Sequence, residues 1–598
     1  MKKIFMFLAA AAAVVSCAKN DVDTNVSVGG SDVESGFSTY ATFTFKTEGT
    51  SSTRASLPTD GSDDQSKISD GKLLIFNAEG SKELAYIGDI VLNGTTTVAT
   101  ISGEKRIFIV ANVGTGTEAA TLLAGMSKDL STLSDFYALM TNDKADDTNT
   151  DDAAELGTYF TEVTRTDNVL MSNGASSESK YTIYPEVTYL DSQANTDQAE
   201  YNNFTIVVKR AVAKAQLGVK ASIIDLGTSE ITTDDNIVKL KYSTMKYAMR
   251  NLNRSTNLTQ QFESDETSDN DYAVTSTETD KTRPYAPYYN VFSALDTENL
   301  TTELFAQYYY DADFDIAINE GDFTYIPENS NDVTTVGNAT YWGIEAEVSS
   351  LASAYVGASI ALGNGDVDTK PVMERRYTIT AAGDASSAAT SISSTFYAVG
   401  VNQLTNGASI FIGASAFYFI DKDVAFTVLY HLLEMAGHIG TPANNNTAIN
   451  DGVWDGNTIP SDCQTSGSLY FATVADFISG YDASLDAINT KLAAAAAAAE
   501  AAEEAWLPSS MDEVLYVYED AKCYYRLNIF EKVGDEKFNL VRRNHAYSGT
   551  ITNFAKLGLP TAGDLEANPG DPVDETETYV TADIKVQDWR EVSVEGGV

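Results

Sequence analysis

The sequence predicts a mainly β protein with two β-sandwich domains, helical insertions and one further strand outside the two domains. Three observations support this fold class. Short apolar or alternating runs, separated by Gly, Asn and Asp, recur over most of the 598 residues, as is typical of sandwiches. Helix-compatible stretches are few and interrupt the strands, which disfavours a regular βαβ array. From Tyr579 onward, apolar and polar side chains alternate after an acidic, proline-containing linker, and this alternation is a strand pattern.

The composition is that of a folded protein with a strongly acidic surface. Hydrophobic residues make up 43% of the chain and aromatic residues 10%, which is ordinary for globular protein. The chain has 39 basic and 85 acidic residues, so its formal net charge is −46. Such a charge repels nucleic acid and anionic lipid surfaces, and no basic cluster offsets it. We therefore expect no nucleic-acid partner.

Residues 1–17 are expected to be a lipoprotein signal peptide. Lys2 and Lys3 precede the apolar run Ile4–Val15, which is too short to span a bilayer and has the length of a signal-peptide core. Small residues then lead to Cys17, in the pattern of a bacterial lipobox. Cys17 is therefore the expected site of lipid attachment. The alternative is an ordinary signal peptide whose cleavage site happens to lie beside a cysteine.

Two further cysteines, Cys463 and Cys523, leave two interpretations open. An exported chain with so few cysteines is not a disulfide scaffold. The pair could form one bridge, or both could be buried thiols, because a separation of sixty residues in the sequence says nothing about their distance in space.

Residues 18–54 are expected to be a propeptide that carries one strand. The strand pattern covers Phe37–Phe45 and is followed by small residues over Thr47–Pro58, with Arg54 at the centre. An exposed, extended segment of small residues is a good protease substrate. Cleavage between Arg54 and Ala55 would release everything before it, including the lipid and the strand. The strand residues singled out are Phe37, Tyr40, Phe43 and Phe45.

Residues 55–224 are expected to form the N-terminal sandwich. Lys72–Phe76 and Arg106–Val113 are continuous apolar runs, typical of strands buried on both faces. Phe204–Val219 indicates either one long strand or a bent pair of strands. Ala119–Met140 has helix-compatible spacing. We place the domain boundary near Asp225.

Residues 225–567 are expected to form a second sandwich with helical insertions. One helix is predicted over Asp423–Ala436, ended by Gly437. A second is predicted over Asp482–Ala505, where seven alanines follow Leu492; because alanine buries little surface, we expect this helix on the surface or against another subunit. The predicted strands are Lys239–Met249, Thr340–Val348, Arg376–Ile379, Thr395–Val401, Val514–Tyr518 and Tyr524–Phe530.

Residues 568–598 are expected to be a linker followed by a separate strand. The linker Asn568–Glu577 is acidic and contains two prolines. Asp588–Arg590 interrupts the alternation that follows, so the tail is either one bulged strand or two short strands; we favour two. The apolar positions are Val580, Ala582, Ile584, Val586, Val592 and Val594, with Trp589 inside the interruption.

The sequence has no recognisable catalytic or metal site, and we expect neither an enzyme nor a cofactor. His431 and His438 are seven residues apart, whereas a zinc-binding helix needs a spacing of four. Asp311–Asp315 resembles the start of a calcium loop, but Ile316 replaces the required glycine and Asp322 the bidentate glutamate. Weak calcium binding there stays open beside the interpretation as a solvated strand edge.

The order of these parts resembles the stalk fimbrillins of type V pili, in particular the main subunit of the short, or minor, fimbriae. The shared features are the lipobox at Cys17, the Arg54–Ala55 site, the all-β body and the detached strand with Trp589. Long insertions around Leu433–Trp506 depart from the pattern. Local likeness is found at Val169–Gly174 and Ile206–Ala215. It is closest in the C-terminal portion, over Val541–Tyr547 and Ile551–Gly558, followed by the linker and the strand with Trp589.

The resemblance implies transthyretin-like, Greek-key sandwiches and assembly by donor-strand exchange. It implies that a precursor, held by lipid at the outer membrane, keeps Phe37–Phe45 in a groove until an arginine-specific protease cuts after Arg54. The strand from Tyr579 to Val594 of a neighbouring copy would then enter the groove, which builds an open-ended homopolymer. The implied product is an adhesive fimbria on the cell surface, with accessory tip and anchor subunits as further partners.

Other functions remain as alternatives. A tip or anchor subunit of the same pilus is the nearest, although a tip needs no donor tail and an anchor should keep its lipid. A monomeric, glycan-binding surface lipoprotein is a second alternative and predicts an intact N-terminus. A secreted hydrolase is a third, without a nucleophile or metal cluster behind it.

Overall fold

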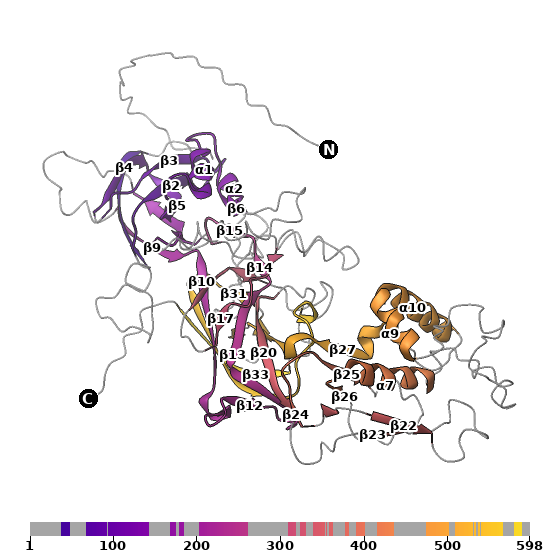
Figure 1. Cartoon of the computed structure of the whole chain (residues 1–598). Helices are drawn as coiled ribbons and strands as arrows, with labels where there is room; N and C mark the ends of the chain where they lie inside the picture. The colour runs from indigo at the N-terminus through magenta and orange to yellow at the C-terminus, as the bar shows by residue number, and fades with distance from the viewer. Residues whose placement is uncertain are drawn as a thin grey trace.

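The structure is a computed structural model, and within its described residues the protein is mainly β, as predicted (Figure 1). The described residues are 37–47, 67–92, 94–142, 168–174, 179–184, 202–260, 309–318, 323–330, 339–352, 354–355, 358–362, 377–381, 390–400, 416–435, 474–501, 509–529, 531–533, 536–538, 540–565 and 579–588.

The N-terminal part is an eight-stranded sheet in the order β3-β2-β5-β7-β9-β1-β4, with β8 paired to β5. One face of β2 and β5 packs on a core that includes Phe43 of β1, and their other face packs on a second core. Both strands are therefore buried on both faces, as their continuous apolar sequences predict. The strands are β1 Ser38–Thr47, β2 Gly71–Asn77, β3 Leu84–Asp89, β4 Thr96–Ile101, β5 Gly103–Ala111, β7 Met171–Ser172, β8 Lys180–Ile183 and β9 Asn203–Arg210.

Two short helices cover the outer face of this sheet: α1 Glu118–Ala124 and α2 Leu133–Tyr137. The side chain of Thr117 caps α1, and Thr132 forms a reciprocal capping box with Asp135 at the start of α2. These caps set where each helix starts. The helical stretch expected over Ala119–Met140 is thus two helices separated by a turn.

The segment Phe204–Val219 is the bent pair of strands, and its two halves belong to different sheets. β9 ends at Arg210, and β10 Val212–Val219 then pairs with β18 and β32. The chain therefore changes sheet at Ala211. The domain boundary near Asp225, and with it the limits 55–224 and 225–567, stays a prediction.

The second sandwich consists of a four-stranded sheet, β18-β10-β32-β33, and a seven-stranded sheet, β11-β12-β13-β20-β24 with β17 on β13 and β28 on β20. Both sheets contribute to one core, with Trp342 of β20 fully buried. Gly549 of β32 leaves room for this ring: a Cβ there would lie 2.8 Å from Leu217 Cδ1 and 3.3 Å from Trp342. The main strands are β13 Val238–Arg250, β18 Thr324–Pro327, β20 Tyr341–Leu351, β28 Lys522–Asn528, β32 His545–Phe554 and β33 Val580–Asp588.

The insertion in the second half forms a small helical unit with its own core, beside the second sandwich (Figure 1). Its helices are α7 Lys422–Met435, α9 Val474–Ala483 and α10 Leu485–Ala501. The helix predicted to start at Asp482 instead starts at Leu485, because the Ser484 hydroxyl accepts a hydrogen bond from the Ala487 N–H and so separates α9 from α10. Ile488 and Leu492 bury the first half of α10 in this core.

The short strands of the seven-stranded sheet are β11 Ile224–Asp225, β12 Glu230–Thr232, β17 Ile316–Ala317 and β24 Thr390–Ser391. A further sheet has the order β21-β26-β25-β27 and contributes residues to the core of the helical unit; its strands are β21 Ala354–Tyr355, β25 Phe396–Gly400, β26 Ala416–Phe419 and β27 Leu515–Tyr518.

The remaining elements are short paired strands and 3-10 turns. They are β6 Met140–Asn142, β14 Leu252–Asn253, β15 Ser255–Asn257, β16 Tyr309–Tyr310, β19 Asn329–Ser330, β22 Ala358–Leu362, β23 Tyr377–Ala381, β29 Glu531–Val533, β30 Glu536–Phe538, β31 Leu540–Val541, and the 3-10 turns η3 Ala221–Ile223, η7 Met511–Glu513, η8 Glu519–Ala521 and η9 Gly563–Leu565.

Cys523 is a free thiol in the core of the second sandwich, beside the Tyr525 hydroxyl; Cys463 lies outside the described residues. Burial raises the pKa of Cys523 to about 12 and also raises the pKa of Tyr341 to about 12. Both groups are therefore neutral in the fold, whereas in the unfolded chain a thiol ionises at about pH 8.5 and a phenol at about pH 10.

This difference predicts a loss of stability in alkali. The contribution of each group is complete below its unfolded pKa and is lost as the pH rises toward the folded pKa. We expect the free energy of unfolding, measured with urea, to fall above about pH 9 by up to ~1.4 kcal/mol per pH unit for each such group. Cys523→Ala should flatten the slope at the lower end of this range. Equal slopes in both proteins would contradict the assignment to the thiol.

Candidate functional site: the lane of β1 and the strand β33

β1 lies inside the N-terminal sheet, between β9 and β4. It runs parallel to β9 from Thr42 to Thr47 and antiparallel to β4 from Ser38 to Phe43. Among the described residues, β1 is the strand that connects β4 to the rest of the sheet. Removal of β1 would therefore leave two facing strand edges, one on β9 and one on β4, with unpaired backbone groups on each. We call the space between these edges the β1 lane.

The side chains of β1 divide between the core and the solvent. Phe43 is fully buried, and its ring stacks on Phe204 with centroids 5.6 Å apart. Phe45 is half-buried against the same core. Phe37 and Tyr40 face outward, with 68% and 37% of their surfaces exposed. Of the four aromatic residues singled out in the sequence, two thus anchor the strand and two do not.

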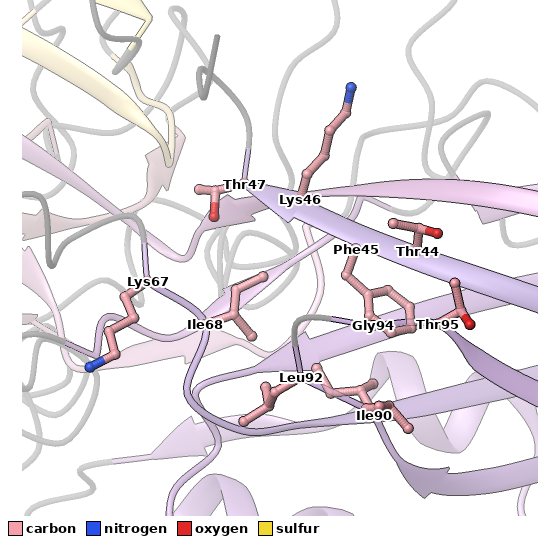
Figure 2. A pocket seen from close by; sticks show the side chains of 11 residues that line it. Thr44, Phe45, Lys46, Thr47, Lys67, Ile68, Ile90, Leu92, Gly94 and Thr95 are labelled. Atoms are coloured by element: carbon pink, nitrogen blue, oxygen red, sulfur yellow. The ribbon is translucent and has the colours of Figure 1, made fainter. Parts of the chain in front are cut away.

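A pocket lies beside the C-terminal end of β1. The pairing of β1 with β4 ends at Phe43, which faces Thr96, whereas the pairing with β9 continues to Thr47. The pocket has a volume of about 550 Å³ and opens where β4 no longer pairs (Figure 2). We call it the β1-end pocket. Its lining residues are Thr44–Thr47, Lys67, Ile68, Ile90–Leu92, Gly94 and Thr95.

The predicted cleavage site and Cys17 both lie outside the described residues. The nearest described residues on either side of the cleavage site, however, line the β1-end pocket. Thr47 is the last described residue before Arg54 and Ala55, and Lys67 is the first after them. Both Thr47 and Lys67 line the β1-end pocket. The segment that carries the cleavage site therefore starts and ends at this pocket.

β33 lies at one edge of the four-stranded sheet of the second sandwich, antiparallel to β32 of the same chain. Val580 is buried, Ala582 and Ile584 pack half-buried on the core, and the residues between them are exposed. This is the alternation that the sequence predicts. Val586 continues the pairing opposite Tyr547. Three further tail residues, Trp589, Val592 and Val594, lie outside the described residues, so the choice between one and two strands stays open.

Three of the segments that carry the family likeness, Val169–Gly174, Ile206–Ala215 and Val541–Tyr547, meet near Ala211, where the chain passes from the N-terminal sheet into the four-stranded sheet. Ser172 comes from the first segment, Arg210 from the second, and Arg543 and Asn544 from the third. Arg210 Nη1 donates to Asn544 Oδ1 at 2.9 Å, and Arg543 Nη1 donates to Ser172 Oγ at 3.3 Å. With Glu328, these residues form what we call the Arg543 junction.

The centre of the Arg543 junction is a fully buried ion pair. Arg543 Nη2 and Nε lie 3.0 and 3.1 Å from Glu328 Oε2, and both side chains are 0% exposed. Gln260 Nε2 donates to the other oxygen, Glu328 Oε1, at 2.9 Å. Buried charges persist only when paired and hydrogen-bonded in this way. Sequence reasoning missed Glu328, because one glutamate in so acidic a chain carries no signal.

The described residues contain no arrangement for metal binding. No group of three or more His, Cys, Asp or Glu side chains is placed there to hold an ion. Asp311, from the segment that resembles a calcium loop, accepts a hydrogen bond from the Asn251 N–H at 2.6 Å and pairs with Arg250 at 2.7 Å. Within the same ranges, none of the helices has both the length and the hydropathy required to cross a bilayer.

Residues 516–595 match the family model described as "Major fimbrial subunit protein type IV, Fimbrillin, C-terminal". The chain resembles the fimbrillins. The matched region runs from β27 through β28 and β32 to β33, so the fimbrillin-like part includes the edge strand and its partner. This match supports a fimbrial or adhesion subunit at the cell surface and favours a structural role over catalysis.

A comparison with solved structures finds matches of low sequence identity and low TM-score. A fimbrilin from Porphyromonas gingivalis W83 is 13% identical, with 94% of this chain and 99% of that chain covered and a TM-score of 0.34. A fimbrial assembly protein from Parabacteroides distasonis ATCC 8503 is 12% identical, with coverages of 60% and 99% and a TM-score of 0.22. A C-terminally truncated tip fimbrial protein from Porphyromonas gingivalis is 13% identical, with coverages of 52% and 78% and a TM-score of 0.24. No curated protein matches the chain.

Proposed function

We propose that the chain is the stalk subunit of an adhesive surface fimbria that polymerises by donor-strand exchange. In this proposal Cys17 carries lipid in an outer-membrane precursor, and an arginine-specific protease cuts between Arg54 and Ala55. β1 then leaves its lane, and the tail of another copy replaces it. The fimbrillin match over residues 516–595 is the observation that carries this proposal, since it covers the strand that would be donated.

The positions of the two strands give exchange a driving force. On its own sheet, β33 pairs with one described strand, β32, because it lies at an edge. A strand in the β1 lane has two neighbours, β4 along its first half and β9 along its second half, with both beside Thr42 and Phe43. Transfer of the tail from an edge to an inner lane thus exchanges one hydrogen-bonded ladder for two, and places alternate apolar side chains over a buried core.

The same positions explain why a protease is needed. While the chain between Thr47 and Lys67 is intact, β1 is covalently held beside its lane at a high effective concentration. A tail from another molecule competes poorly against such a tethered strand. Cleavage at Arg54 turns the tethered strand into a separate fragment that can be replaced and lost by dilution.

The proposal is tested by the assembly of Arg54 variants. Assembly is seen as a ladder of polymer bands when unboiled samples are run on a denaturing gel. Arg54→Ala and Arg54→Lys should both yield folded, uncleaved monomers in cells that carry an arginine-specific protease. Limited trypsin treatment, which cuts after lysine as well as arginine, should restore assembly only to Arg54→Lys. Removal of residues 579–598 should permit cleavage but abolish the ladder. Ladders from Arg54→Ala, or from the tail deletion, would contradict the proposal. The absence of a ladder from the cleaved wild type would also contradict it, and would favour the monomeric lipoprotein or an accessory subunit.

A further inference from the structure

The β1-end pocket lies where replacement of β1 by another strand can begin. Over Thr44–Thr47, β1 has β9 on one side and the pocket on the other, because its ladder with β4 ends at Phe43. A strand held on one side separates more readily than one held on both. β1 has one ladder at each end, with β4 over Ser38–Ala41 and with β9 over Thr44–Thr47. Because the pocket lies beside Thr44–Thr47, this is the end where an incoming strand has room and where β1 should begin to leave the lane.

Cleavage would free β1 at this same end. Arg54 lies seven residues beyond Thr47, which lines the pocket, so a cut after Arg54 makes a new chain end seven residues along the chain from it. The other end of β1 pairs with β4, with Ser38 opposite Ile101 and the Phe37 carbonyl accepting from the Ser102 N–H at 2.9 Å, and it lies away from the cut. Replacement that begins at the pocket can then proceed toward Ser38 one residue pair at a time.

The pocket has the chemistry to hold an apolar, acidic strand. Phe45, Ile68 and Ile90 form its floor, and Figure 2 shows their side chains turned toward one another. At its rim, Val91 and Leu92 are 52% and 42% exposed, and large apolar side chains in such positions favour a docking partner.

Two lysines give the rim a positive charge in an otherwise acidic molecule. Lys46 and Lys67 line the pocket, and Figure 2 shows their amino groups pointing away from its apolar floor. Residues 579–598 have four acidic and two basic side chains, and the linker 568–578 has four acidic side chains and no basic one. The tail is thus complementary to the pocket in charge, as well as in its alternating apolar side chains.

We propose that the β1-end pocket is the first docking point for the tail, residues 579–598, of a second copy of this chain, which then displaces β1 from Thr47 toward Ser38. This inference rests on the proposed function and adds to it the place and direction of exchange. The competing occupant is the chain's own segment 48–66, which starts and ends at the pocket and contains one large apolar residue, Leu57.

The experiment measures capture of a fluorescent synthetic peptide of residues 579–598 by the full-length subunit after cleavage at Arg54. Leu92→Asp should lower the second-order rate constant by about tenfold, because the docked apolar contact is lost. The milder Leu92→Ser should lower it less. Lys67→Glu should lower it too, and should reduce the acceleration seen at low salt. Leu130→Asp is the matched control, because Leu130 is 79% exposed and lies outside the pocket.

The possible results test the proposed docking point and the proposed function separately. Equal rates for both Leu92 variants and Leu130→Asp, with normal capture by the wild type, would overturn the docking point and leave strand exchange standing. Failure of the cleaved wild type to capture the peptide at all would overturn the proposed function. Faster capture by Leu57→Asp than by the wild type would show that segment 48–66 covers the pocket, and would also overturn the inference. Circular dichroism of each variant confirms that the fold is retained.

Discussion

Glu328→Gln is expected to lower the free energy of unfolding by about 3–5 kcal/mol. The substitution removes the counter-charge of Arg543 while its guanidinium stays fully buried in the Arg543 junction. The amide can keep part of the hydrogen bonding, so the effect is that of an uncompensated charge in a fully buried site. Urea denaturation of the full chain measures the loss.

The matched control is an ion pair on the surface of the N-terminal sheet. Lys72 pairs with Asp89, whose side chain is 81% exposed, so Asp89→Asn should cost less than about 1 kcal/mol. The double variant Glu328→Gln with Arg543→Met should lose less than the sum of the two single variants, because it leaves no unpaired charge behind. Additive losses would show that the two side chains do not act as a pair.

Phe43→Ala is expected to destabilise the N-terminal sheet by about 3–5 kcal/mol and to accelerate assembly after cleavage. The first effect follows from loss of a fully buried ring that stacks on Phe204. The second follows because β1 must leave its lane before a tail can occupy it, so a weaker β1 opposes exchange less. Urea unfolding of the uncleaved precursor measures the first effect, and peptide capture by the cleaved subunit measures the second.

Tyr40→Ala is the control on the same strand. Tyr40 is 37% exposed and faces away from the core, so its loss should change stability by about 0.5 kcal/mol or less and leave the capture rate near that of the wild type. If Phe43→Ala destabilised the precursor but slowed capture, β1 would have to help the incoming strand rather than compete with it, and the proposed order of events would be wrong.

Local patterns in the sequence predicted a strand well where the order of its own apolar and polar residues indicates how it is buried. The continuous apolar run at Lys72–Phe76 predicts a strand buried on both faces, and β2 has that environment. The alternation from Val580 to Ile584 likewise predicts the half-buried β33. The alanine-rich helix was placed correctly over most of its length, but its start was not, because the cap at Ser484 competes with continuous helix.

Features that join distant segments had no such local signal. The passage from β9 to β10 into another sheet at Ala211 depends on strands more than 100 residues away, such as β18 and β32. The β1-end pocket combines residues from β1 with others near Lys67 and Ile90, each of which is ordinary in its own run of sequence. Glu328 meets Arg543 across 215 residues, and neither residue differs in type from many others.

The course of β9 into β10 also determines how the molecule would bear tension in a filament. A pull from a tail held in the β1 lane enters through β9 and reaches β10 at its start, near Val212. A pull from the chain's own donated tail is partly taken up where Leu559 pairs with Tyr524 of β28, and the rest arrives at the end of β32, near Phe554. Because β10 and β32 are parallel, from Lys214 opposite Ala546 to Val219 opposite Ile551, the two forces act at opposite ends of the ladder. The hydrogen bonds are then loaded together in shear instead of being peeled one after another, which lets a thin strand pair transmit force along the length of the subunit.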